Sequence, residues 1–155
     1  MMEMPKLVDQ HRKLQSLAGS WSGEEKLYPS PWDPKGGAAT GRIEARVALD
    51  GFFVVSDYVE ERSGQVSYRG HGVFGWDPAE KCYTMNWFDS MGSGSAAPAR
   101  GQWEGDVLTF EHRTPMGHAR YVYDFEGDRK YSFRIEQSRD GKDWSTFMEG
   151  TYTRK

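Results

Sequence analysis

The stretch RIEARVALDGFFVVSDY, residues 42–58, decides the fold because a turn signal stands between two alternating segments. Asp50-Gly51 favours a tight β-turn, since glycine accepts a positive φ at little cost. A turn at this dipeptide predicts pairs that share one face: Ile43–Tyr58, Ala45–Ser56, Val47–Val54 and Leu49–Phe52. The charged residues at 42, 44 and 46 then fall on the other face, so the turn and the burial pattern predict the same register.

Two further hairpins are predicted downstream. A turn at Asp140-Gly141 predicts the pairs Phe133–Met148, Ile135–Thr146 and Gln137–Trp144. A turn at Pro115-Met116 predicts the pairs Leu108–Tyr123, Phe110–Tyr121 and His112–Ala119. The other face of this last hairpin pairs Glu111 with Arg120, an attractive cross-strand couple. We therefore expect the face that carries His112 to point inward.

Alternation of this kind continues over most of the chain. It predicts about ten strands, near 19–28, 38–49, 52–62, 66–76, 82–90, 99–104, 106–114, 118–126, 130–138 and 143–153. One helix is expected over 5–18, where apolar residues recur at helical spacing after Pro5. Short links favour an up-and-down order, and closure into a barrel removes the sheet edges. The expected fold is an all-β, closed antiparallel barrel, as one domain over 1–155.

Strand direction predicts where the links lie. The two long, loose links, 29–40 and 91–99, fall at the same end of such a barrel, away from the helix. The tight turns fall at the helix end. We therefore expect a cup with a plugged base and a loose mouth, where binding residues usually gather.

Composition excludes several classes of protein. The 155 residues carry a net charge of -3, which argues against a nucleic-acid binder with a basic face. Aromatic residues make up 14% of the chain, which argues against disorder. No apolar run is long enough for a membrane span, no secretory h-region opens the chain, and Cys82 is the single cysteine. We expect a cytoplasmic protein without a membrane span; self-association into a homodimer is left open.

Two stretches resemble known barrel families. Leu17-Ala18-Gly19-Ser20-Trp21-Ser22-Gly23 resembles the Gly-x-Trp opening of lipocalin-like (calycin-type) proteins, in which a short helix precedes the first strand. Residues 70–92, GHGVFGWDPAEKCYTMNWFDSMG, resemble an uncharacterised bacterial lipocalin-like family of unknown function. Gly19-x-Trp21-x-Gly23 with Tyr28-Pro29 also resembles, faintly, the first strand of nitrobindin-type haem barrels. These resemblances imply the fold and leave the ligand open.

Candidate ligand-binding residues follow from the predicted inner face. His112 lies near the mouth beside Phe110, Tyr121 and Tyr123, opposite the small Ala119. A neutral imidazole there could orient a polar ligand group or ligate haem iron, or it could simply bond a neighbouring tyrosine. Trp87 alternates with Tyr83 and Met85, a pattern that core packing also explains.

Arg69 and His71 share one face of their strand. They could anchor a ligand inside the cup, or they could lie outside if Tyr68, Phe74 and Trp76 face inward. The sequence leaves both registers open. The four histidines lack a metal-ligand spacing, so no metal site is predicted.

The favoured function is binding of a small apolar or amphipathic molecule in the barrel, with haem as a special case. An alternative is a cavity-based isomerase or hydrolase that uses His112 or His71 as its acid-base group. A third reading is an interaction module without a ligand. A barrel fold serves all three, so the choice rests on the site.

Overall fold

The computed structural model describes residues 3–31, 33–94, 97–114 and 117–155. A short helix, α1 (Asp9–Leu14), and a 3₁₀ turn, η1 (Gln15–Leu17), precede ten strands. The strands are β1 (Gly19–Leu27), β2 (Gly37–Ala48), β3 (Phe53–Arg62), β4 (Gln65–Asp77), β5 (Cys82–Asp89), β6 (Ala99–Glu104), β7 (Val107–Thr114), β8 (Gly117–Glu126), β9 (Lys130–Ser138) and β10 (Ser145–Arg154).

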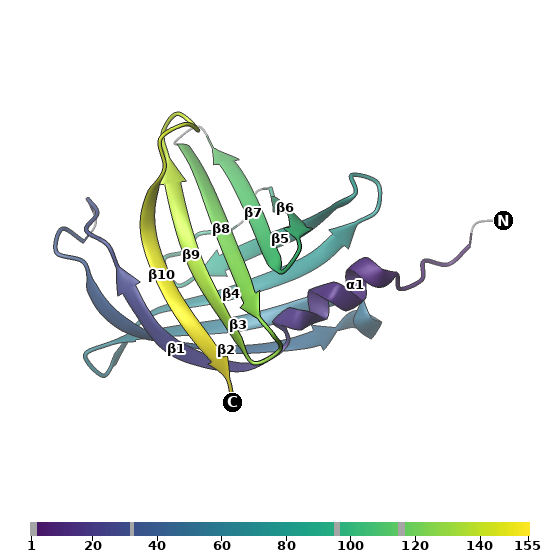
Figure 1. The fold of residues 1–155 in the computed structure, drawn as a ribbon, viewed down its shortest axis with the longest axis horizontal. Coiled ribbons are helices and arrows are strands. Elements are labelled where there is room, and N and C mark those ends of the chain that lie inside the picture. The colour runs from purple at the N-terminus through teal and green to yellow at the C-terminus, as the bar shows by residue number, and fades with distance from the viewer. Residues whose placement is uncertain (1–2, 32, 95–96, 115–116) are drawn as a thin grey trace.

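All ten strands form one closed barrel, in which each strand is antiparallel to the next and β10 returns to pair with β1 (Figure 1). The predicted fold class is confirmed. The helix is shorter than the expected 5–18, because it begins at Asp9 and residues 3–8 are not helical. No helix in the described part of the chain is long and apolar enough to cross a bilayer.

The hairpin that decides the fold has the predicted register. Ile43 pairs with Tyr58 and Val47 with Val54, although the turn is a 3₁₀ turn over Leu49–Gly51 instead of a two-residue turn. The β7–β8 register is confirmed as well, with Phe110 opposite Tyr121. The turn predicted at 115–116 lies outside the described residues.

The predicted register of the last hairpin is wrong. Phe133 pairs with Gly150, and Met148 pairs with Ile135, because the ladder shifts between Thr146 and Met148. The link between β9 and β10 spans residues 139–144 and is held by side chains: Asp140 accepts backbone N–H bonds from Lys142 and Asp143. The longer link and the bulge displace the pairs expected from a two-residue turn.

The two ends of the barrel differ as the strand directions predicted. With every neighbour antiparallel, links 28–36 and 90–98 leave the same end, and the helix enters at the other. Helix α1 covers that base: the ring of His11 meets Phe52 edge-on, and Lys13 bonds the carbonyl of Gly105. The base is therefore closed, and the opposite end is the mouth.

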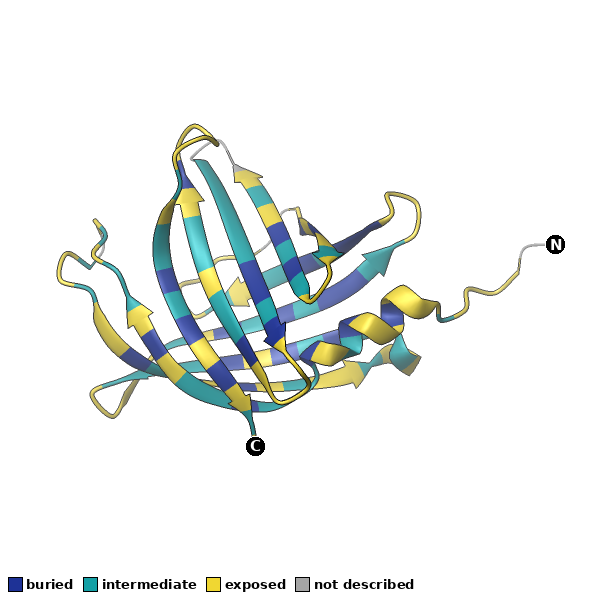
Figure 2. Ribbon diagram, in the orientation of Figure 1, coloured by how far each residue is buried: buried dark blue, intermediate teal, exposed yellow. Residues whose placement is uncertain are grey.

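Most of the core lies in the half of the barrel next to the helix. Trp21 is 1% exposed and donates its indole N–H to the carbonyl of Leu17, which fixes η1 on β1. Figure 2 shows buried residues alternating with more exposed ones along the strands, as inward and outward positions do. The core is dominated by aromatic side chains, including Phe74, Tyr83, Phe110, Phe125 and Tyr131. Space for a ligand must therefore be sought in the half next to the mouth.

Candidate functional site

Four aromatic side chains face inward in the half of the barrel next to the mouth, and we call them the mouth wall. They are Tyr68, Trp87, Tyr121 and Phe133, from β4, β5, β8 and β9. All four pack on the core yet keep intermediate exposure, in contrast to the core below them. Solvent therefore reaches the inner surface from the mouth.

Glycine and hydrogen bonds hold Trp87 against the strand beside it. A Cβ atom on Gly70 would lie 1.9 Å from the Trp87 ring, so the indole lies flat against β4 only because this residue is glycine. The indole N–H donates to the Tyr68 hydroxyl at 2.7 Å. That hydroxyl donates to Asp89 Oδ2 at 2.9 Å. Trp87 and Tyr68 are thus held in place without a ligand.

A carboxyl group is buried beside the mouth wall. Glu25, on β1, is 3% exposed, and its Oε2 accepts hydrogen bonds from the hydroxyls of Tyr58 (2.6 Å) and Tyr152. Its other oxygen, Oε1, is buried and has no hydrogen-bond partner among the described residues. Gly41 leaves the room this group needs, because a Cβ atom there would lie 2.3 Å from Oε2. An unpaired buried polar atom of this kind is rare and costly.

Glu60 brings a second carboxyl group to the same place. The Tyr58 hydroxyl lies 3.1 Å from Glu60 Oε2 as well as 2.6 Å from Glu25, so one donor stands between two carboxyls, which we call the carboxyl pair. Burial raises the pKa of Glu25 to about 7; the hydrogen bonds from Tyr152 and Tyr58 oppose this rise, and the charge of Glu60 adds to it. Glu25 can therefore hold or release a proton near neutral pH.

The structure divides the predicted inner residues between core and mouth. Phe110 (0% exposed) and Tyr123 (8%) are core residues whose rings pack edge to face. Tyr121 and Trp87 belong to the mouth wall. His112 is half-buried and lines a depression of about 310 Å³ at the mouth, together with Ala119 and Trp144.

Arg69 and His71 lie on the outer face of β4. Of the two registers that the sequence left open, the structure has the one in which Phe74 is buried and Tyr68 and Trp76 pack on the core. His71 Nδ1 lies 2.7 Å from Asp57 Oδ1 in an exposed pair. These two residues cannot anchor a ligand inside the cup, and we leave them out of the site.

The surroundings of His112 do not fit haem. A haem group that is ligated there would need a flat apolar slot beside the imidazole. The described side chains that line the depression include Glu111, Arg113, Asp140 and Lys142. This charged lining suits a polar ligand group better than a porphyrin face.

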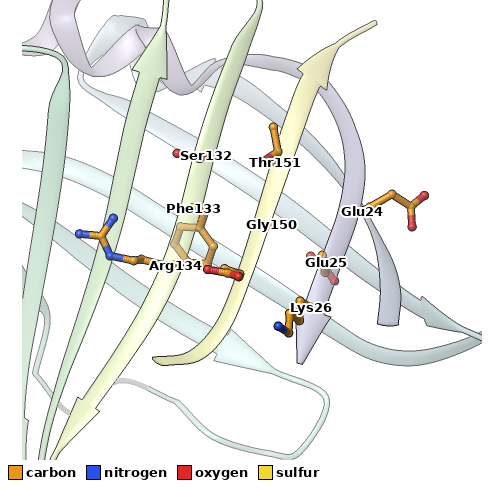
Figure 3. A pocket seen from close by; sticks show the side chains of 9 residues that line it. Glu24, Glu25, Lys26, Ser132, Phe133, Arg134, Gly150 and Thr151 are labelled. Carbon is orange, nitrogen blue, oxygen red and sulfur yellow. The ribbon is translucent and has the colours of Figure 1, made fainter. Parts of the chain in front are cut away.

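The sequence reasoning missed Glu25. The signal was available, because Glu25 stands four residues after Trp21 and therefore on the same face of its strand. Its neighbour Glu24 is exposed on the outer face. A depression of about 360 Å³ there is lined by Glu24, Lys26, Arg134 and Glu149, and Glu25 and Phe133 also contribute to its lining (Figure 3). Nothing in the local pattern distinguishes the two glutamates except their parity along β1.

The fold has similar solved structures at low sequence identity. Rv2717c from M. tuberculosis matches with a TM-score of 0.71 and 14% identity, over 97% of this chain and 99% of that one. The S-type phycobiliprotein lyase CPES from Guillardia theta matches with a TM-score of 0.66 and 10% identity, over 97% and 98%. No curated protein sequence matches significantly. Residues 6–154 match a family model described as "Protein of unknown function (DUF1579)".

Proposed function

Since the chain belongs to the DUF1579 family, a family of unknown function, we propose a function from its own geometry: it binds a small, partly apolar molecule in the mouth half of the barrel. The mouth wall supplies aromatic contact area, and the carboxyl pair supplies a polar end. This division is typical of ligand sites, which place a few polar groups among apolar walls. The expected membership of an uncharacterised barrel family is confirmed, while the lipocalin-like placement stays a prediction.

The observation that carries the proposal is the unpaired oxygen of Glu25. Burying a carboxyl group without a full set of partners costs free energy. A chain that only needed a packed interior would be more stable with an apolar residue there. A ligand that completes the hydrogen bonding of Oε1 gives this side chain a reason to be buried.

Barrel size and the fold comparison support the same reading. Eight-stranded barrels are already wide enough for one small ligand, and this barrel has ten strands. One of the similar structures is named a phycobiliprotein lyase, and this name implies that the protein acts on another molecule. The likeness is one of fold, so it supports binding by analogy alone.

His112 completes the proposed site at the rim. It lies on the inner-facing side of β7, opposite Ala119, where a ligand would pass. A half-buried imidazole there can bond the outer end of a ligand while the carboxyl pair bonds the inner end.

The first test asks whether a molecule occupies the mouth. Native mass spectrometry and absorbance of the protein purified from cells should show a co-purified small molecule. Isothermal titration with tryptophol, a neutral aromatic alcohol, measures binding directly.

A matched pair of variants then locates the site. Ile135 is half-buried and pairs with inward-facing Tyr121, whereas its neighbour Arg134 is exposed. Ile135→Trp should fill the mouth and weaken binding at least about tenfold, while Arg134→Trp should leave it unchanged. Equal binding by the two variants would refute the proposed function. The absence of both a co-purified molecule and tryptophol binding would refute it too.

A further inference from the structure

The chemistry of the inner surface near the mouth is anionic. Glu25, Glu60 and Asp89 all reach it from β1, β3 and β5. The cation of Arg62, at the mouth end of β3, is already used: its guanidinium pairs with Asp33 at 2.7 Å and bonds the carbonyl of Gly36. Arg113, Arg120 and Lys142 line the depression around His112 at the rim. A ligand that passes the rim then meets carboxyl groups on the inner surface.

These three carboxyls are not equally available. Asp89 accepts the Tyr68 hydroxyl and the backbone N–H groups of Met91 and Ser93, so its oxygens are satisfied. Glu60 accepts the Ser67 hydroxyl at 3.1 Å and remains half-exposed. Glu25 alone has a buried oxygen without a partner.

The missing partner of Glu25 is a hydrogen-bond donor. Oε2 already receives two tyrosine hydroxyls, and the group nearest to completing the site is another carboxyl, Glu60, which donates only when it is protonated. Two carboxyls that share a donor accept a proton between them, or a cation in its place.

We propose that the site takes an amphipathic amine, whose ammonium group bonds the carboxyl pair and whose apolar body lies on the mouth wall. This inference rests on the proposed function and names its ligand class. On binding, the proton held by the pair leaves for solvent, and the ligand's N–H bonds replace it. The ligand charge then compensates the carboxylate charge, as a buried ionised group requires.

Three probes with one indole body separate charge from shape. Tryptamine carries an ammonium group at neutral pH, tryptophol is neutral, and indoleacetate is anionic. We expect tryptamine to bind about tenfold more tightly than tryptophol, and indoleacetate to bind least. Titration of tryptamine in two buffers of different ionisation enthalpy should show release of up to about one proton near pH 7.

Two variants assign the preference to the pair. Glu25→Gln removes the charge and keeps the shape, so it should abolish the preference for tryptamine and the proton release. Glu24→Gln, one residue away on the outer face, should change neither. Glu60→Gln should weaken the preference, and it serves if Glu25→Gln fails to fold by circular dichroism.

The outcomes distinguish the inference from the function beneath it. If tryptophol binds at the mouth and tryptamine binds no better, the amine inference is overturned and the proposed function stands. Preference for indoleacetate, or proton uptake, overturns it too, because the pair would then be donating to an acceptor. If none of the three binds, the amine inference is overturned, and the proposed function falls with it when no small molecule co-purifies either.

Discussion

Among single residues, Glu25 links stability to the site most directly. Its pKa is raised from 4.5 to about 7 because burial disfavours the charged form. The folded state therefore binds a proton more tightly than the unfolded chain does. The stability that this provides is present below the unfolded pKa and is lost as pH rises through the folded pKa.

Unfolding measurements at several pH values test this linkage. We expect the free energy of unfolding to fall between about pH 4.5 and pH 7, by up to roughly 3 kcal/mol for a shift of this size. Glu25→Gln should remove that fall and exceed the wild type in stability above pH 7. Urea unfolding at pH 5.5 and pH 8 measures both effects. A Glu25→Gln protein with the same pH dependence as Glu24→Gln would contradict this account.

His112 offers a second test at this scale. Because it is half-buried at the rim, His112→Ala should cost less than about 1 kcal/mol of stability while weakening tryptamine or tryptophol binding severalfold. His71, on the outer face of β4 where it pairs with Asp57, lies outside the site and provides the control. Titration and urea unfolding of both variants decide it. Equal binding by both would remove His112 from the site.

Strand β4 shows which features of the mouth wall can be predicted from the sequence and which depend on packing. The Trp87 ring lies against β4 because Gly70 and Gly72 have no side chains. The mouth wall therefore depends on glycine at both positions. Whether this strand presents Arg69 and His71 or Tyr68 inward was not readable from the sequence. Both sets alternate, and an irregularity in the β3–β4 ladder at Glu60/Glu61 changes the register near the mouth.

A single methyl group on β4 should disturb this wall. Gly70→Ala would place a Cβ atom 1.9 Å from the Trp87 ring, so the indole must move and break its bond to Tyr68. We expect a loss of about 1–3 kcal/mol and weaker tryptophol binding. Val66→Ala, at an exposed position of the same strand, should have little effect on either. Unchanged stability and binding in Gly70→Ala would show that Trp87 is not held in place by this strand.

The strands were predicted better than the site. Alternation and the Asp50-Gly51 turn determine the β2–β3 register, because only one register buries Ile43 and Val54 together. The predicted β9–β10 register is wrong because the Asp140 side chain stabilises a link longer than a two-residue turn. The dipeptide Asp140-Gly141 alone does not reveal this length. Glu25 was missed because its burial depends on Tyr58 and Tyr152, which come from strands far away in sequence.

For the whole molecule, the closed ladder makes one seam different from the others. Every pairing but one joins strands that follow each other in the chain, whereas β1 and β10 meet across nearly its full length. The Tyr152–Glu25 hydrogen bond lies on that seam and spans 127 residues.

Folding order then bears on when the protein becomes able to bind. Contacts between distant residues form slowly, because the chain must lose the entropy of a long loop before they contribute stability. The β1–β10 seam should therefore close late in refolding, and Glu25 meets Tyr152 only at that step. In stopped-flow refolding, competence for tryptamine should return with the slowest phase, after most of the far-ultraviolet signal of the strands. A nascent chain would stay without its ligand until the last strand is in place.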